Sequence, residues 1–250
     1  MHDTQVALVT GANKGIGLQI AKDLAARGLT VLVGSRDLER GEAAAKAVGA
    51  RALALQLDAT SRASIAAAAE RIRSELGRLD VLVNNAGISN ISEPGTPLAQ
   101  VLGASRPSVV SLDELRAIFE TNVFGVVAIT QAMLPLLREA PVGRVVNVSS
   151  TLGSLAMQSD PAGPFRSMPN GSYSPSKSAL NAITIAFATE LAGTRVKVNA
   201  VCPGYTATDL NAFSGTRTVQ EGAREPVRLA LLDASGPTGT FSNEDGALPW

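Results

Sequence analysis

The stretch TGANKGIG at residues 10–17 decides the fold. It follows the apolar run QVALVT and leads directly into an amphipathic segment, the strand, turn and helix order of a phosphate-binding βα unit. Gly11 permits a tight turn, Gly15 lets backbone amides approach a pyrophosphate, and Gly17 lets helix and strand pack closely. An ordinary strand-to-helix turn is the plainer alternative. The predicted cofactor-binding residues of this stretch are Gly11, Asn13, Lys14, Gly15, Ile16 and Gly17.

Outward from this stretch, short apolar runs alternate with longer segments rich in Ala, Leu, Arg and Glu. Because the runs are almost continuously apolar, we expect strands buried on both faces, in a parallel sheet between layers of helices. The expected strands are 5–10, 29–34, 51–57, 79–85, 143–150, 194–201 and 238–243, and the expected helices are 15–28, 38–48, 61–76, 111–139 and 174–192. This order predicts one α/β domain over residues 1–250, a doubly wound Rossmann fold with a seven-stranded parallel sheet.

Two stretches rich in Pro and Gly interrupt the alternation, 88–110 and 151–172. We expect both to be loops, either functional lids or mobile surface segments. The pairs Ser111 with Glu114 and Thr218 with Glu221 match the capping box that opens a helix.

Composition excludes several classes of protein. The chain has 250 residues with 22 basic and 22 acidic groups, so we expect neither nucleic acid nor a membrane as partner. The single cysteine, Cys202, allows no internal disulfide and is expected to be a small buried side chain, which favours a cytoplasmic location. With His2 as the only histidine, neither a Ser-His-Asp hydrolase nor a metal site is expected.

The end of the second expected strand bears on the cofactor. Ser35 and Arg36 stand there, where an Asp or Glu would bind the ribose 2′-hydroxyl of NAD. Arg36 and Lys14 together would form a cationic pocket for a 2′-phosphate, since charge-assisted bonds to phosphate are strong. Either side chain alone is as readily a solvated surface group. The pair favours NADPH/NADP.

Further motifs follow in order: Asn84-Asn85-Ala86-Gly87, Asn147-Val148-Ser149-Ser150, Tyr173-Ser174-Pro175-Ser176-Lys177 and Cys202-Pro203-Gly204. With the glycine stretch, they resemble the short-chain dehydrogenase/reductase family over nearly the whole chain, and most resemble its NADPH-dependent carbonyl reductases. The resemblance implies Asn122, Ser150, Tyr173 and Lys177 as catalytic residues. It also implies cofactor contacts from Asp58, Asn85, Gly87, Tyr173, Lys177, Pro203, Gly204 and Thr206. Asp58 is equally well explained as a turn former at a strand end.

The chemistry of the Tyr-Lys pair can be argued from spacing alone. Four residues on a helix bring Tyr173 and Lys177 to one face, where the ammonium is expected to lower the phenol pKa and make an acid and base usable near neutrality. In the family, the serine bonds the substrate carbonyl, the lysine also binds the nicotinamide ribose, and the asparagine supports a water relay.

The expected function is NADPH-dependent reduction of a ketone or aldehyde, with Tyr173 as proton donor. Alternatives are oxidation of a secondary alcohol by the same residues and an NADPH-sensing regulator without turnover. The expected partner is a small carbonyl substrate. Family resemblance further implies a homodimer or homotetramer, through helices that carry Leu115, Phe119, Ile183 and Phe187; covering the sheet is their other possible role.

Overall fold

The computed structural model describes residues 4–93 and 95–250, so His2 lies outside the described residues. Within them, eight strands form one sheet in the order β3-β2-β1-β4-β5-β6-β7-β8. The parallel strands are β1 Val6–Thr10, β2 Thr30–Ser35, β3 Ala52–Gln56, β4 Val81–Asn84, β5 Gly143–Val148, β6 Val196–Val201 and β7 Phe241–Asn243. The predicted seven-stranded parallel sheet is confirmed, and a short strand, β8 Gly246–Ala247, pairs antiparallel with β7.

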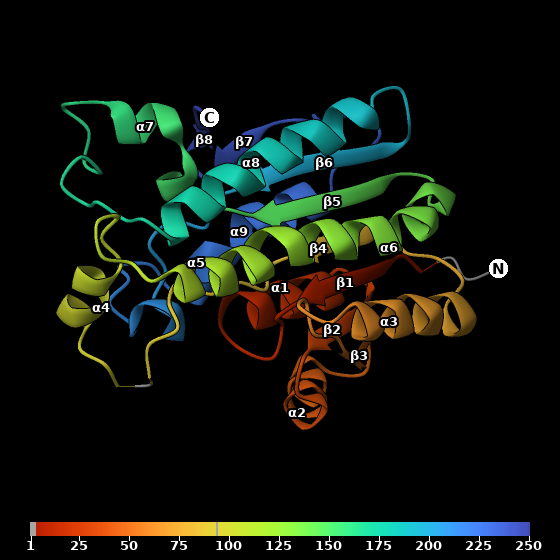
Figure 1. Ribbon diagram of the computed structural model, residues 1–250. Helices are drawn as coiled ribbons and strands as arrows, with labels where there is room; N and C mark the ends of the chain where they lie inside the picture. Colours follow the sequence, from red (N-terminus) through yellow and green to blue (C-terminus); the bar gives the residue numbers. More distant parts are fainter. Residues whose placement is uncertain (1–3, 94) are drawn as a thin grey trace.

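Helices cover both faces of the sheet (Figure 1). One layer contains α1 Gly15–Ala26, α2 Leu38–Val48 and α9 Val219–Ala230, and the other contains α3 Arg62–Glu75, α6 Gly125–Glu139 and α8 Tyr173–Glu190. Neighbouring residues of β1 enter opposite cores: Leu8 packs in the second layer's core, and Ala7 and Val9 pack in the first. Period-two alternation with apolar residues on both faces is what a doubly covered strand requires.

The helix expected over 111–139 is continuous but not uniform. It runs as α5 Leu112–Phe119, a π-helical turn η1 Glu120–Phe124, and then α6. By length and composition this 28-residue stretch could cross a membrane, but half of its most apolar window is buried. Ile118, Ile129 and Met133 are all at most 1% exposed, which is the position of a core helix.

Both stretches expected to be loops contain short helices, so that prediction was partly wrong. The first contains α4 Leu98–Ala104, and the second contains a 3-10 turn, η2 Thr151–Gly153, and α7 Leu155–Ser159. In α7 the side chain of Ser154 accepts from the amide of Met157, a cap that lets five residues coil without a long apolar periodicity.

The two expected capping boxes differ in outcome. Thr218 and Glu221 bond reciprocally at the start of α9. Ser111 accepts the amide of Glu114 at 3.1 Å, as expected, but the Glu114 carboxylate is bonded elsewhere and does not return to Ser111. The capping box of Ser111 and Glu114 is therefore only half formed.

Candidate active site

The predicted site residues converge on one edge of the sheet. The glycine stretch follows β1, Ser35 ends β2, Asn85 and Gly87 follow β4, Ser150 follows β5, and the Pro203-Gly204 turn follows β6. In open α/β sheets ligands bind at the carboxyl ends of the strands, where the strand order reverses. Here the order reverses between β1 and β4, where the first and second halves of the sheet meet.

The turns after β1 and β4 are locked together. Thr10 Oγ1 accepts from the backbone amides of Asn85 and Ala86, each at 3.0 Å, and Asn85 Nδ2 donates to the Thr10 carbonyl at 2.9 Å. A Cβ on Gly11 would lie 2.9 Å from Ala86 Cα, and one on Gly17 would lie 2.4 Å from Asn85 Nδ2. Side chains at these two positions would therefore force the turns apart.

The start of α1 fits a pyrophosphate. Lys14, at the N-cap, has an extended backbone and makes no side-chain cap, and the first turn of this 12-residue helix holds no acidic residue. Its first amides thus have no capping side chain, and they add to the positive end of the helix dipole. A hollow of about 360 Å³ opens beside Lys14 and Gly15, bounded across by Thr208, Asp209 and Phe213. Asn13 and Ile16 are half-buried in this turn.

The two cations expected at the 2′-phosphate differ in their surroundings. Ser35 is buried, while Arg36 is exposed and has no ion pair or hydrogen bond within residues 4–93 and 95–250. Lys14 Nζ instead pairs with Asp209 Oδ2 at 2.6 Å, in the 3-10 turn η3 Asp209–Asn211. The sequence analysis missed this partner, because a pairing across 195 positions leaves no local pattern.

Ser150, Tyr173 and Lys177 lie together between β5 and α8. Ser150 lies near enough to Tyr173 to lower the pKa of its phenol, and Ser150 Oγ accepts the amide of Leu152 at 3.1 Å. Lys177 is 4% exposed; its ammonium donates to the Val148 carbonyl at 2.8 Å and lies 5.6 Å from the centroid of the Tyr173 ring. The expected helical pairing of tyrosine and lysine is therefore present, with the serine at its side.

The expectation for the phenol pKa was wrong in sign. Burial raises the pKa of Tyr173 above its usual value, the nearby Cys202 sulfur raises it further, and the bond to Ser150 lowers it. Desolvation penalises the charged phenolate, and the Lys177 ammonium is directed at a carbonyl. Tyr173 therefore keeps its proton at neutral pH, which suits a proton donor.

Burial also lowers the pKa of Lys177, from 10.5 to about 8, with the Cys202 sulfur opposing the change. Between these values the unfolded chain holds a proton that the folded protein lacks, so stability rises with pH in that window.

We expect the free energy of unfolding of the parent, relative to Lys177→Met, to increase between pH 8 and 9.5 by at most about 1.4 kcal/mol per pH unit. Urea denaturation across this range measures the free energies, with the exposed Lys46→Met as the control variant. A free-energy difference between the parent and Lys177→Met that does not change with pH would contradict the lowered pKa of Lys177.

Asn122 is fully buried in the π-helical turn and joins three parts of the site. Its Oδ1 accepts the amide of Ile88 at 2.9 Å, and its Nδ2 donates to the Ile88 carbonyl and to Ser176 Oγ. A Cβ on Gly87 would lie 3.2 Å from Asn122 Oδ1 and 3.7 Å from Lys177 Nζ. The structure thus brings Gly87, Asn122 and Lys177 together, while the water relay stays a prediction.

The remaining predicted residues are engaged locally. Asp58 Oδ1 accepts the amide and hydroxyl of Thr60, the turn-forming alternative, and its adenine contact stays a prediction. Thr206 is buried and donates to the carbonyls of Pro203 and Gly204. Cys202 is buried and unpaired, as expected, and its sulfur accepts the amides of Thr151 and Gly204.

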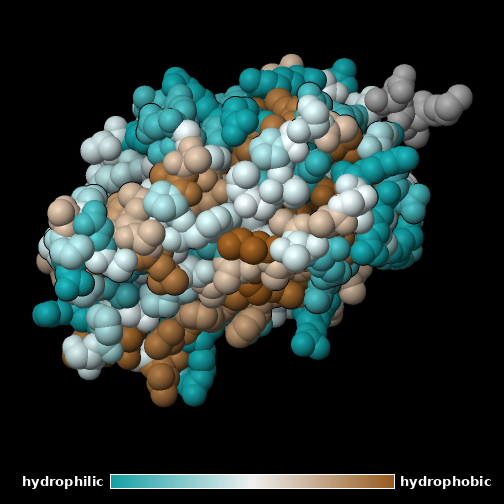
Figure 2. All heavy atoms as spheres, turned by 90° about the horizontal axis from the view of Figure 1, so that it is seen from above, coloured by the Kyte–Doolittle hydropathy of each residue, from teal (hydrophilic) through white to brown (hydrophobic). Residues whose placement is uncertain are grey.

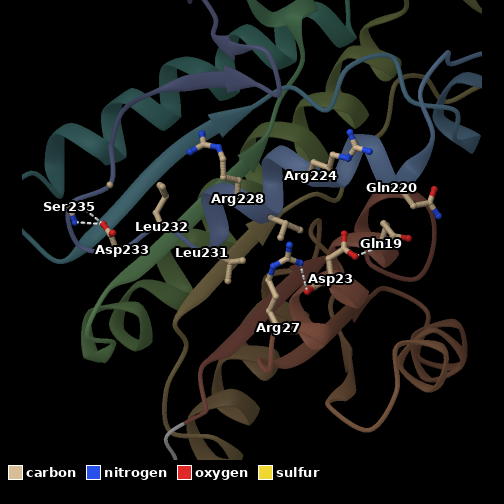
Figure 3. A pocket seen from close by; sticks show the side chains of 12 residues that line it. Gln19, Asp23, Arg27, Gln220, Arg224, Arg228, Leu231, Leu232, Asp233 and Ser235 are labelled. Atoms are coloured by element: carbon tan, nitrogen blue, oxygen red, sulfur yellow. Dashed lines mark hydrogen bonds between the residues drawn. The ribbon is translucent and has the colours of Figure 1, made fainter.

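A larger groove, of about 790 Å³, lies elsewhere, between α1 and α9 (Figure 3). Several of its polar side chains are already engaged: Gln19 donates to the Asp23 carboxylate, Arg27 donates to the Asp23 backbone carbonyl, and Arg228 pairs with Glu225. None of the predicted catalytic residues reaches it. Size alone therefore does not locate the chemistry in this protein.

Comparison with known proteins identifies the family of the chain. Residues 5–218 match the family described as short chain dehydrogenase. The chain is 35% identical to (-)-isopiperitenone reductase of Mentha piperita, over 97% of each chain. It is also 35% identical to carbonyl reductase [NADPH] 1 of Homo sapiens, over 98% of each.

Solved structures of reductases have the same fold as this chain. The NADPH-bound carbonyl reductase from chicken fatty liver superposes with a TM-score of 0.80 at 26% identity, over 99% of each chain. The 3-ketoacyl-(acyl-carrier-protein) reductase of Brucella melitensis, complexed with NADH, also gives 0.80, at 28% identity and over 96% of each chain. Fold, site and relatives define an oxidoreductase that acts on carbonyls or alcohols. The chain belongs to the short-chain dehydrogenase/reductase family.

Proposed function

We propose that this protein reduces the carbonyl of a ketone or aldehyde to an alcohol, with NADPH as cofactor. The observation that carries the proposal is the grouping of Ser150, Tyr173 and Lys177 between β5 and α8, where burial raises the pKa of Tyr173. A phenol that stays protonated at neutral pH can give a proton to a substrate oxygen, but is a poor base for oxidising an alcohol. This supports the reductive direction over the oxidative one.

The roles of the chain's residues follow from their positions. A carbonyl oxygen placed against the Ser150 and Tyr173 hydroxyls would accept two hydrogen bonds, which strengthen as the oxygen gains negative charge. The bound cofactor would supply the hydride to the carbonyl carbon. Tyr173 would then give its proton to the oxygen, completing the alcohol. Lys177, with a pKa of about 8 and its Nζ beside the Tyr173 ring, is placed to return a proton to the phenolate.

The choice of NADPH rests on Arg36. Its guanidinium is exposed, without a partner in the described part of the chain, at the end of β2. A planar guanidinium matches a phosphate through two parallel hydrogen bonds. The human and chicken relatives carry NADPH in their names, while the Brucella enzyme was solved with NADH, so the phosphate contact needs its own test.

A panel of ketones and aldehydes, followed by the loss of NADPH absorbance, tests the proposal. Turnover of at least one carbonyl compound is expected. NADPH binding without turnover across the panel would favour the NADPH-sensing alternative, although the Ser150, Tyr173 and Lys177 arrangement exceeds what a sensor needs. Faster turnover of a secondary alcohol with NADP at neutral pH would reverse the assigned direction.

We also propose assembly into a homodimer or homotetramer. Phe187, one of the expected contact residues, is buried in the core, and Leu115, Phe119 and Ile183 are half-buried. The apolar side chains that face outward are others, Phe124 at 56% and Ile185 at 39% exposure. Figure 2 shows apolar side chains in the middle and along the lower edge of the face that carries α8.

Light scattering at micromolar concentration is expected to give the mass of two or four chains. Phe124→Glu combined with Ile185→Glu should shift the mass toward one chain, because burying two carboxylates at an apolar contact is costly. A single-chain mass for the parent would contradict the assembly.

A cytoplasmic location is proposed on the unpaired cysteine alone.

A further inference from the structure

Glu114 is a buried carboxylate that the proposed mechanism does not use. It is 6% exposed, and the half-formed capping box leaves its side chain free of Ser111. Its Oε1 accepts the Ser172 hydroxyl at 3.0 Å, and it lies 3.3 Å from Ser105 Oγ, whose single hydrogen is shared with the Val101 carbonyl at 2.9 Å. Those hydroxyls are the only partners of the carboxylate within residues 4–93 and 95–250.

The two serines belong to the two long segments that flank the site. Ser105 caps the end of α4 in the segment 88–110, and Ser172 is the last residue before Tyr173. Both are buried, at 2% and 0% exposure. Glu114 therefore connects the first segment, through one oxygen atom, to the residue from which the catalytic helix begins.

A second contact holds the same turn. The amide of Gly171 donates to the Ser105 carbonyl at 2.7 Å, and a Cβ on Gly171 would lie 2.7 Å from Pro107 Cα. Asn170 Oδ1 accepts the amides of Ser172 and Ser174, at 3.1 and 3.0 Å. The backbone immediately before Tyr173 therefore contacts the segment 88–110, to which Glu114 is bonded through Ser105.

We propose that Glu114 is a positioning residue: by tying Ser172 to Ser105 it fixes the backbone at the start of α8, from which Tyr173 reaches the site beside Ser150. A buried carboxylate is costly without hydrogen-bond donors, so the Ser172 hydroxyl is held toward it, while Ser105 shares its hydrogen between Glu114 and the Val101 carbonyl. The positive end of α8 lies at the same point and favours a negative charge there. The inference rests on the proposed role of Tyr173 as proton donor.

The chain provides a matched control. Glu221 occupies the same third position of a capping box at the start of α9, but it is half-buried and completes its box with Thr218. Losing Glu221 removes a cap and nothing that reaches α8. Glu114→Gln is the conservative variant, because both serines bond to one oxygen and an amide oxygen can accept both.

The experiment compares Glu114→Ala, Glu114→Gln, Ser172→Ala and Glu221→Ala. For Glu114→Ala we expect kcat to fall by about ten- to a hundredfold, as for a small displacement of a catalytic group, with the NADPH dissociation constant within about twofold of the parent. In the cofactor-free protein, hydrogen exchange should quicken over residues 170–174. Ser172→Ala should follow the same direction, while Glu114→Gln restores kcat to within about threefold. Glu221→Ala should leave kcat and this exchange unchanged.

A Glu114→Ala variant with kcat within about threefold of the parent would overturn the inference. So would an equal loss in Glu114→Gln, or a parallel loss of NADPH affinity, because either would replace positioning by charge or by general disruption. If Glu114→Ala does not fold, Ser172→Ala and Glu114→Gln still decide. The proposed function fails separately, on Tyr173→Phe: an inactive Tyr173→Phe with a fully active Glu114→Ala would refute only the positioning role.

Discussion

Tyr173→Phe is expected to keep NADPH affinity and to lose turnover by about a hundred- to ten-thousandfold, the usual contribution of general acid catalysis. The ring fills the same space, and the Lys177 bond to the Val148 carbonyl does not involve the hydroxyl. Only the hydroxyl is removed, with its transferable proton and its interaction with Ser150. Single-turnover kinetics at saturating NADPH, with cofactor affinity from fluorescence titration, measures both quantities.

The chain's other tyrosine serves as the control. Tyr205 is 51% exposed, and its hydroxyl bonds to Ser214 in the loop after β6. Tyr205→Phe removes one phenol hydroxyl of the same chemistry, so it should change kcat little. Near-parent turnover in Tyr173→Phe, or an equal loss in Tyr205→Phe, would remove Tyr173 from the role of acid.

Local patterns were enough to predict much of this molecule. The strands could be located because short runs such as residues 29–34 are apolar at most positions without alternation, as strands covered on both faces of a sheet are. Tyr173 and Lys177 could be placed on one helix face because four residues make about one turn. The remaining site residues follow the carboxyl ends of parallel strands, which all lie at one edge of the sheet. They therefore come close together whatever the length of the intervening chain.

Features that depend on distant partners could not be predicted. The Glu114 carboxylate follows a capping-box sequence, yet it bonds to Ser105 and Ser172 because the folded chain buries it between them. The pKa of Tyr173 is raised because desolvation, together with the Cys202 sulfur, outweighs the lowering by Ser150, a balance that residue spacing does not contain. Asn122 lies in a π-helical turn, and nothing in Thr121-Asn122-Val123 distinguishes that turn from an α-helix.

Arg36→Asp is expected to move cofactor preference from NADPH toward NADH. The free Arg36 guanidinium would contribute about 1.5 to 3 kcal/mol through charged bonds to the 2′-phosphate, which is about ten- to a hundredfold in affinity. An aspartate at this position repels the phosphate and accepts from a 2′-hydroxyl, so NADPH should lose affinity while NADH gains. The ratio of kcat/KM for the two cofactors measures the change.

Lys14→Ala should act in the same direction but less strongly. Lys14 already pairs with Asp209 at 2.6 Å, so a 2′-phosphate must displace that carboxylate before the ammonium contributes, and part of the interaction energy is spent in the exchange. Arg40→Ala is the matched control, because Arg40 is an exposed cation four positions beyond Arg36 that pairs with Asp37. Its cofactor ratio should equal the parent's. A parent that prefers NADH, or an unchanged ratio in Arg36→Asp, would show that Arg36 does not bind the 2′-phosphate and that preference is set elsewhere in the site.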